Sequence, residues 1–408
     1  MERMRIKKST PLLALLALVA TAAAAPVPAA TSKTQPAAKP KTAPATASKK
    51  PATSTAKKTA APKASPKATA KAAPKKRSRR VYSPWSEPTF ADSTVGDDIS
   101  GEDLTVRRAA VQALGRYNGS VVVVNPLNGR ILSMVNQRLA LQSGFQPCST
   151  VKLPVAVAGL VENVIERDTP VRIYGSTRLT LTEALARSNN QFFAALGSKL
   201  GFERFRYYAR LLGLGERAGL NIEGERLGAF PETPPRGTSV GIMSSFGEGI
   251  SLTPLQLAAM LSSFANGGTL YYLQYPRSLA EVRDYIPQVK RRLDIERWLP
   301  DLTPGMSAAV EYGTARRANY DPSEPVLGKT GTCTENRTHL GWFGSFNSVG
   351  HNRLVVVVLL TGGPGVSGPT AAEIAGNMYK RLSMENFFAE KWEFSPTALL
   401  STQSCCAQ

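Results

Sequence analysis

Three short motifs along the chain combine side chains that are able to perform acyl transfer. They are Ser149-Thr150-Val151-Lys152, Ser188-Asn189-Asn190 and Lys329-Thr330-Gly331-Thr332. A serine hydroxyl is a weak nucleophile until a base removes its proton. A lysine amine becomes such a base when burial and nearby positive charge lower its pKa. We therefore interpret Ser149 as a candidate nucleophile and Lys152 as its candidate base.

The other two motifs suit the remaining needs of such a reaction. Ser188 is a candidate proton relay, and the Asn190 amide is suited to holding a substrate amide. In the third motif the absence of a side chain at Gly331 lets a substrate backbone approach. The amine of Lys329 and the hydroxyl groups of Thr330 and Thr332 suit a carboxylate. The backbone N–H groups of Ser149 and Thr332 are candidates for an oxyanion hole, in which one donor contributes ~3 kcal/mol.

Each of the first two motifs is weak evidence when taken alone. Ser54–Lys57 repeats the spacing of the first motif within a low-complexity region, and Ser345–Asn347 repeats that of the second. The specific signal is the occurrence of all three motifs in order, the first two in predicted helices and the third on a predicted edge strand.

The apolar patterning predicts the elements that position these motifs. A pair of strands is expected around the Asn128-Gly129 turn, over 120–135. Helices are expected over 100–117 (opened by Ser100 with Asp103), 148–164, 181–200, 253–266 and 304–318. They are followed by strands at 326–333, 341–346 and 354–360 and by a helix over 370–386. This order predicts an α+β fold, with an antiparallel sheet flanked by helices and an all-helical lobe.

The N-terminal region has the composition of an exported tether. Residues 1–25 combine four basic residues with an apolar run and small residues, which predicts either a cleaved signal peptide or an uncleaved membrane anchor. Residues 26–94, rich in Ala, Lys and Pro, are expected to be a disordered linker. Residues 95–390 form the predicted catalytic domain and 391–408 a C-terminal tail. The chain is therefore expected to be exported to the periplasm or cell envelope, where the tether is either a plain spacer or binds anionic envelope polymers or lipids.

Charge and cysteine content exclude several classes of function. The formal charge is +20, but residues 1–80 hold 19 of the 50 Lys and Arg and one of the 30 acids, so the rest is nearly neutral. A nucleic-acid arm is disfavoured by the export signal that precedes it. With four cysteines, two histidines and no phosphate-binding glycine loop, neither a metal site nor a cofactor is expected.

From about residue 100 to 386 the chain resembles the transpeptidase domain of penicillin-binding proteins, which share their motifs with the serine β-lactamases. The resemblance extends beyond the motifs to SVVVVNPLNGRILSMV (120–135), FGEGISLTPLQLAAMLSSFANGGTL (246–270) and YGTARRA (312–318). It implies a β-lactamase-like fold. It also implies that Ser149 is acylated by a D-Ala-D-Ala stem peptide, with peptidoglycan stem peptides and β-lactam antibiotics as ligands. Lys152 would be the base, Ser188 the relay and Asn190 the amide ligand, while Lys329, Thr330 and Thr332 would hold the terminal carboxylate.

The chain departs from the family at the residue before the nucleophile, which is commonly glycine and here is Cys148. Cys333 directly follows the third motif. In some class A β-lactamases that hydrolyse carbapenems, cysteines at these two places form a bridge. The resemblance therefore implies a Cys148–Cys333 disulfide, with two buried thiols as the alternative. The family's large N-terminal domains have no counterpart, and the spacing from Ser149 to Ser188 is short, so the helical lobe is expected to be trimmed.

Three alternatives to a D,D-transpeptidase remain open. A D,D-carboxypeptidase or a serine β-lactamase would use the same fold. A β-lactamase needs a base for deacylation, and neither a glutamate in an Ω-loop nor the S-x-V variant of the second motif is present. A catalytically silent envelope-binding module is the alternative of another class, and the intact set of three motifs argues against it.

Overall fold

The computed structural model describes residues 84–142, 144–220 and 222–389 of the chain. The predicted export segment, residues 26–83 of the predicted linker and the tail from residue 391 lie outside the described residues. Among the described helices, none combines the length and the apolar character needed to cross a membrane.

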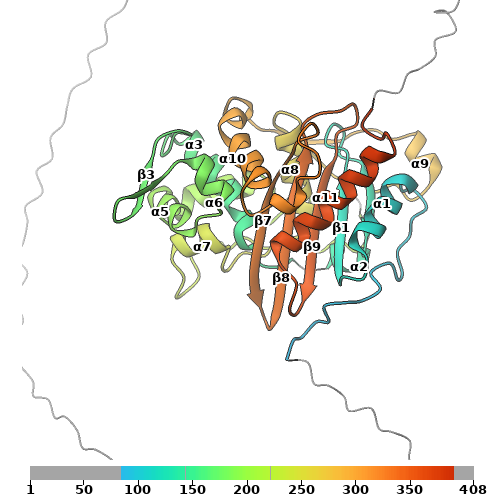
Figure 1. The fold of residues 1–408 in the computed structure, drawn as a ribbon, viewed down its shortest axis with the longest axis horizontal. Helices are drawn as coiled ribbons and strands as arrows, with labels where there is room; N and C mark the ends of the chain where they lie inside the picture. Colours follow the sequence, from blue (N-terminus) through green and yellow to red (C-terminus); the bar gives the residue numbers. More distant parts are fainter. Residues whose placement is uncertain (1–83, 143, 221, 390–408) are drawn as a thin grey trace, which may run out of the picture. The chain divides into compact units, whose positions relative to one another are not determined.

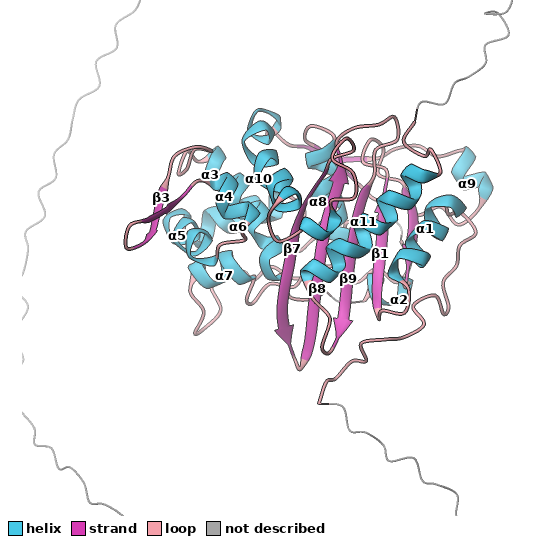
Figure 2. Cartoon of the chain, in the orientation of Figure 1, coloured by secondary structure: helices cyan, strands magenta, loops and turns pink. Residues whose placement is uncertain are grey.

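Five strands form one antiparallel sheet in the spatial order β2-β1-β9-β8-β7, which Figures 1 and 2 show at the centre of the domain. Strands β1 and β9 are central and lie among buried side chains on both faces. Successive side chains of a strand point to opposite faces, so Val122 and Val357 join one core while Val121 and Val358 join the other. This explains why both strands are continuous apolar runs. The strands are β1 (Gly119–Val124), β2 (Ile131–Val135), β7 (Val326–Glu335), β8 (Thr338–Asn347) and β9 (Val355–Gly362).

Helices cover both faces of the sheet. Helices α1 (Leu104–Leu114) and α11 (Gly368–Met384) pack on one face, in front of the strands in Figure 1. Helix α8 (Pro254–Ala265) packs on the other face, where Leu257 and Leu261 join the core that contains Val122. Every residue of α8 is buried, which makes it the central helix between the sheet and the remaining elements.

The helical lobe lies beside β7, which is an edge strand. Its helices are α3 (Lys152–Val161), α4 (Leu181–Ala186), α5 (Asn190–Leu200), α6 (Phe202–Leu211), α7 (Val240–Phe246) and α10 (Leu299–Glu311). Smaller elements are α2 (Gln137–Leu141), α9 (Leu279–Arg283) and two antiparallel strand pairs. The first is the hairpin of β3 (Val171–Tyr174) with β4 (Thr177–Leu179), and the second pairs β5 (Thr269–Tyr271) with β6 (Val289–Arg292). Three short 3₁₀ helices cover Cys148–Val151, Glu296–Trp298 and Arg316–Ala318.

The predicted fold class is confirmed, and so are several local signals. The Asn128-Gly129 turn joins β1 to β2, with Gly129 in the left-handed region at φ 78°. Thr253 caps α8 in a capping box with Gln256, because each side chain bonds to the other residue's backbone N–H. The third motif lies on the edge strand β7, as expected.

Two predicted helices were wrong in extent. The first begins at Leu104, because Asp103 itself caps the helix and Ser100 bonds to Asp98 instead. The helix expected over 304–318 runs from Leu299 to Glu311, with Pro300 in its first turn and Pro304 in its interior.

The helix predicted over 181–200 is two helices, and the break carries the second motif. Helix α4 ends at Ala186, Ser188 adopts a left-handed backbone at φ 53°, and Asn189 caps α5 by accepting from the N–H of Phe192. Asparagine favours such caps, so the Asn189-Asn190 pair was the sequence signal for this break.

Residues 84–94 belong to the segment predicted as linker, yet in the structure they contact the sheet. The N–H and hydroxyl of Ser86 donate to Arg337 and Asn336 in the β7–β8 turn. The Thr89 hydroxyl accepts from the N–H of Gly363, and Trp85 packs against His339 with ring centroids 4.2 Å apart. The aromatic side chains of Trp85 and Phe90 provide apolar contact with the domain, through His339 and Tyr117.

Candidate active site

Ser149 and Lys152 lie at the junction of a 3₁₀ turn and helix α3. Ser149 is within the turn Cys148–Val151, and Lys152 begins the α-helix. The spacing of three residues places both side chains on one face, and Lys152 Nζ lies 2.7 Å from Ser149 Oγ. The structure thus brings the candidate nucleophile and base into direct contact.

The second motif meets the same lysine from the break between α4 and α5. Lys152 Nζ lies 3.1 Å from Ser188 Oγ and 3.0 Å from the Ser188 carbonyl oxygen, and it donates to Asn190 Oδ1 at 2.7 Å. The left-handed backbone of Ser188 turns both of its oxygens toward the amine. Asn190, expected to hold a substrate amide, here bonds to Lys152.

Lys329, on strand β7, also contacts Ser188. Its Nζ donates to Ser188 Oγ at 2.8 Å and to the Thr330 carbonyl at 2.9 Å. The Ser188 hydroxyl therefore lies between two amines, and both lysine side chains are fully buried. The structure brings Ser149, Lys152, Ser188 and Lys329 into one continuous hydrogen-bonded chain.

Burial in this hydrogen-bonded network favours the neutral form of both lysine side chains. Desolvation, followed by repulsion from Lys329, lowers the pKa of Lys152 from 10.5 to about 6. Desolvation alone lowers the pKa of Lys329 from 10.5 to about 7. Lys152 is accordingly neutral for the most part at pH 7, and a neutral amine is able to accept the Ser149 proton.

Both threonine hydroxyl groups of the third motif are hydrogen-bonded within the domain. Thr330 Oγ1 lies 2.6 Å from Thr314 Oγ1, and Thr332 Oγ1 accepts from the Gly368 N–H at 2.8 Å. Thr314 is a site residue that the three motifs do not indicate. It is part of the YGTARRA sequence (312–318) in the family resemblance, which assigns no role to it. Its N–H also donates to Ala186, so Thr314 links α4 to β7.

Gly331 of β7 lies close to the turn that carries Ser149. A Cβ atom built on Gly331 would lie 3.0 Å from the Pro147 oxygen and 3.3 Å from Cys148 Cβ. Both contacts are tighter than ordinary van der Waals contact, which explains why the third motif has glycine here.

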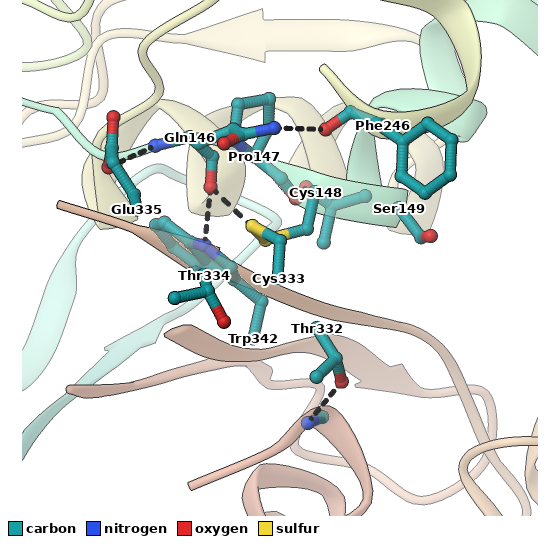
Figure 3. Close-up of a disulfide and its surroundings, with 12 residues drawn as sticks. Gln146, Pro147, Cys148, Ser149, Phe246, Thr332, Cys333, Thr334, Glu335 and Trp342 are labelled. Atoms are coloured by element: carbon teal, nitrogen blue, oxygen red, sulfur yellow. Dashed lines mark hydrogen bonds between the residues drawn. A yellow bond between two sulfur atoms is a disulfide. The ribbon is translucent and has the colours of Figure 1, made fainter. Parts of the chain in front are cut away.

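A disulfide bond joins Cys148 to Cys333, with the Cα atoms 5.6 Å apart (Figure 3). The predicted bridge is therefore present. Two further contacts join the same segments: Glu335 accepts from the Gln146 N–H at 3.2 Å, and the Trp342 indole N–H donates to the Gln146 carbonyl at 3.0 Å. The turn before the nucleophile is thus attached to the β7–β8 hairpin at three places.

The described residues contain no group of three or more His, Cys, Asp or Glu side chains arranged to hold a metal ion. In the same part of the chain, no carboxylate hydrogen-bonds to Ser149, Lys152 or Ser188. The contact between Ser149 and Lys152 is suited to nucleophilic attack by a serine with an amine as base.

The chain is similar to one family of known proteins. The family model of the penicillin binding protein transpeptidase domain matches residues 119–380. Stage V sporulation protein D of Bacillus subtilis is 28% identical over 310 residues, covering 64% of this chain and 48% of that protein. Peptidoglycan D,D-transpeptidase MrdA of Haemophilus influenzae is 23% identical, covering 73% of this chain and 58% of that protein.

A solved structure of similar fold is PBP2 of Pseudomonas aeruginosa in complex with WCK 5153. It has a TM-score of 0.61 and 22% identity, covering 72% of this chain and 80% of that one. The chain spans about half the length, or less, of the first curated relatives it matches.

Proposed function

The chain belongs to the penicillin-binding protein transpeptidase domain family, and on that premise we propose that it is a serine D,D-transpeptidase. It would act on D-Ala-D-Ala stem peptides and cross-link peptidoglycan through an acyl-enzyme on Ser149. The observation that carries the proposal is the hydrogen-bonded chain Ser149–Lys152–Ser188–Lys329, whose two amines have pKa values of about 6 and about 7.

Acylation begins with proton transfer from Ser149 Oγ to the neutral amine of Lys152, 2.7 Å away. The oxygen then attacks the carbonyl carbon of the penultimate D-Ala. The backbone N–H groups of Ser149 and Thr332 bind the oxyanion that develops. Ser188, in contact with Lys152, passes a proton to the departing nitrogen, so terminal D-Ala leaves as an amine and the acyl-enzyme remains.

The terminal carboxylate of the donor requires a positive or hydroxyl-rich partner. Lys329 Nζ, 2.8 Å from Ser188 Oγ, supplies the charge, and binding of a carboxylate favours its protonated form. The donor lies along the part of β7 that contains Thr330, Gly331 and Thr332. Asn190 exchanges its hydrogen bond to Lys152 for one to the donor amide and so orients it.

The fate of the acyl-enzyme separates the proposal from its alternatives. Attack by an amine gives a cross-link, whereas attack by water gives a D,D-carboxypeptidase or, with a β-lactam, a β-lactamase. Rapid hydrolysis requires a base directed at water, and no described carboxylate bonds to Ser149 or Lys152. This supports slow deacylation and therefore a long-lived penicilloyl-enzyme.

We further propose that the protein works in the periplasm or cell envelope, held there or directed there by its N-terminal segment. Cross-linking of stem peptides takes place outside the cytoplasmic membrane, and a disulfide persists in that oxidising compartment. Peptidoglycan stem peptides and β-lactam antibiotics are the proposed ligands.

Labelling with a fluorescent penicillin tests the proposal. The full-length protein is expected to give a labelled band that persists for many minutes, and Ser149→Ala should abolish it. A label that is lost within seconds with turnover of the drug identifies a β-lactamase. Absence of labelling in a correctly folded wild-type protein would favour the silent envelope-binding module.

A second assay separates transpeptidation from carboxypeptidation. The protein is incubated with a synthetic pentapeptide ending in D-Ala-D-Ala, with and without a D-amino acid as amine acceptor. Mass spectrometry of the products should show acceptor-linked tetrapeptide in excess of hydrolysed tetrapeptide. Hydrolysis alone, unaffected by acceptor concentration, assigns a carboxypeptidase.

A further inference from the structure

The backbone of Cys148 adopts an unusual conformation directly before the candidate nucleophile. Its φ is 51°, in the left-handed region, and its side chain is 1% exposed. Only glycine enters this region without steric cost, and a residue with a Cβ atom remains there only when its surroundings hold it. A specific restraint must therefore act on Cys148.

The contacts in Figure 3 identify that restraint. The disulfide to Cys333 is the covalent link between Cys148 and β7. The bonds from Gln146 to Glu335 and Trp342 hold the chain two residues earlier. The N–H and hydroxyl of Thr150 also donate to the Pro147 carbonyl across Cys148, at 3.1 and 2.7 Å. These hydrogen bonds lie within the turn, whereas the disulfide is the covalent link that holds Cys148 to β7.

The bridge joins the two residues adjacent to the proposed oxyanion hole. Cys148 shares a peptide group with Ser149, so rotation about its backbone changes where the Ser149 N–H points. Cys333 follows Thr332, whose N–H is the other proposed donor. A Cβ atom added to Gly331 would lie only 3.3 Å from Cys148 Cβ, so the lack of a side chain at Gly331 lets β7 approach the turn this closely.

We propose that the Cys148–Cys333 bridge holds Cys148 in its left-handed conformation and thereby aims the Ser149 N–H into the oxyanion hole beside that of Thr332. Cys148 and Cys333 are then positioning residues for acylation. This inference rests on the proposed function, because it concerns the oxyanion of the same reaction. It makes a distinctive prediction: glycine at position 148, which tolerates a φ of 51° unaided, removes the need for the bridge.

The test uses full-length protein in a Cys405→Ser/Cys406→Ser background, so that only the bridge changes. Three proteins are compared: the background itself, Cys333→Ser, and Cys148→Gly/Cys333→Ser. Stopped-flow acylation by a fluorescent penicillin separates the limiting acylation rate from the dissociation constant of the initial complex. Thermal unfolding is measured on each protein in parallel.

We expect Cys333→Ser to lower the limiting acylation rate at least about tenfold, since complete loss of one oxyanion donor costs about 100- to 1,000-fold. The dissociation constant should change less than about threefold. Cys148→Gly/Cys333→Ser should restore the rate to within about threefold of the background. Both variants lack the bridge and should have similarly lowered melting temperatures, so the rate difference between them does not reflect stability.

Two outcomes overturn the inference alone. One is a limiting rate in Cys333→Ser equal to that of the background, which makes the bridge purely structural. The other is a slow Cys333→Ser that glycine does not rescue. If Cys333→Ser fails to fold, dithiothreitol reduction of the folded background protein replaces it, and an unchanged rate after reduction again overturns the inference. A folded background protein that penicillin does not acylate refutes the proposed function itself and this inference with it.

Discussion

The depressed pKa of Lys152 makes the pH dependence of acylation a direct test of its role as base. Lys152 acts only when neutral, and its pKa is lowered to about 6 by burial and by Lys329. With that value the neutral fraction is about 91% at pH 7 and about 9% at pH 5, so the acylation rate should fall about tenfold between them. Above pH 7 the titration of Lys152 raises the acylation rate only by about a further tenth.

A lysine with the ordinary pKa of 10.5 would behave differently. Its neutral fraction would rise about tenfold for each pH unit from pH 5 to pH 9. The second-order rate constant for a fluorescent penicillin, measured at constant ionic strength over that range, distinguishes the two cases. A rate that continues to climb tenfold per unit beyond pH 8, or that is flat from pH 5 to pH 8, refutes the assignment of Lys152 as a base with a lowered pKa.

Asn190→Asp provides the matched control. The replacement has nearly the same shape and puts a carboxylate where Asn190 Oδ1 now lies, 2.7 Å from Lys152 Nζ. An adjacent negative charge favours the protonated amine, so the rising limb should move up by about one to three pH units. A profile unchanged by this variant would show that another group controls the limb.

Three further substitutions each test one feature of the structure: a buried amine, a close approach of two segments and a helix cap. Lys152→Met should abolish labelling but raise the melting temperature. The pKa of this lysine is 10.5 in the unfolded chain but about 6 in the folded protein, so its protonation favours unfolding, most strongly at low pH. The increase in melting temperature caused by Lys152→Met should therefore become smaller as the pH approaches 10. Gly331→Ala, with its Cβ 3.0 Å from the Pro147 oxygen, should destabilise the fold by about 1–3 kcal/mol in denaturant unfolding and slow acylation about tenfold or more; unchanged kinetics would contradict the close approach. Thr253→Ala removes the α8 cap and should cost about 1 kcal/mol of unfolding free energy with an unaltered acylation rate, because α8 lies outside the site.

Much of this fold could be predicted because its signals are local. Valine-rich runs predict strands, Asn128-Gly129 predicts a hairpin, and Thr253-Pro254 predicts the start of a helix. The membership of Ser149 and Lys152 in one site could also be predicted, because three residues span about one helical turn.

What could not be predicted depends on contacts between distant segments. The Asn189-Asn190 pair signals a helix cap, but the left-handed backbone of Ser188 depends on tertiary contacts with Lys152 and Lys329. The hydroxyl pair Thr314–Thr330 joins segments whose register is set only once β7 is in place. The packing of Trp85 on His339 likewise depends on the position of the β7–β8 turn.

The disulfide also has a topological consequence. Cys148 and Cys333 are 185 residues apart, so the bridge closes a covalent ring that contains the helical lobe and every candidate residue from Ser149 to Thr332. A protease that cuts an exposed loop of this ring, such as residues 231–239, opens the ring without releasing a fragment. The ring also cannot close until residue 333 has been synthesised, so the turn that carries the nucleophile receives its covalent restraint only after the whole lobe exists.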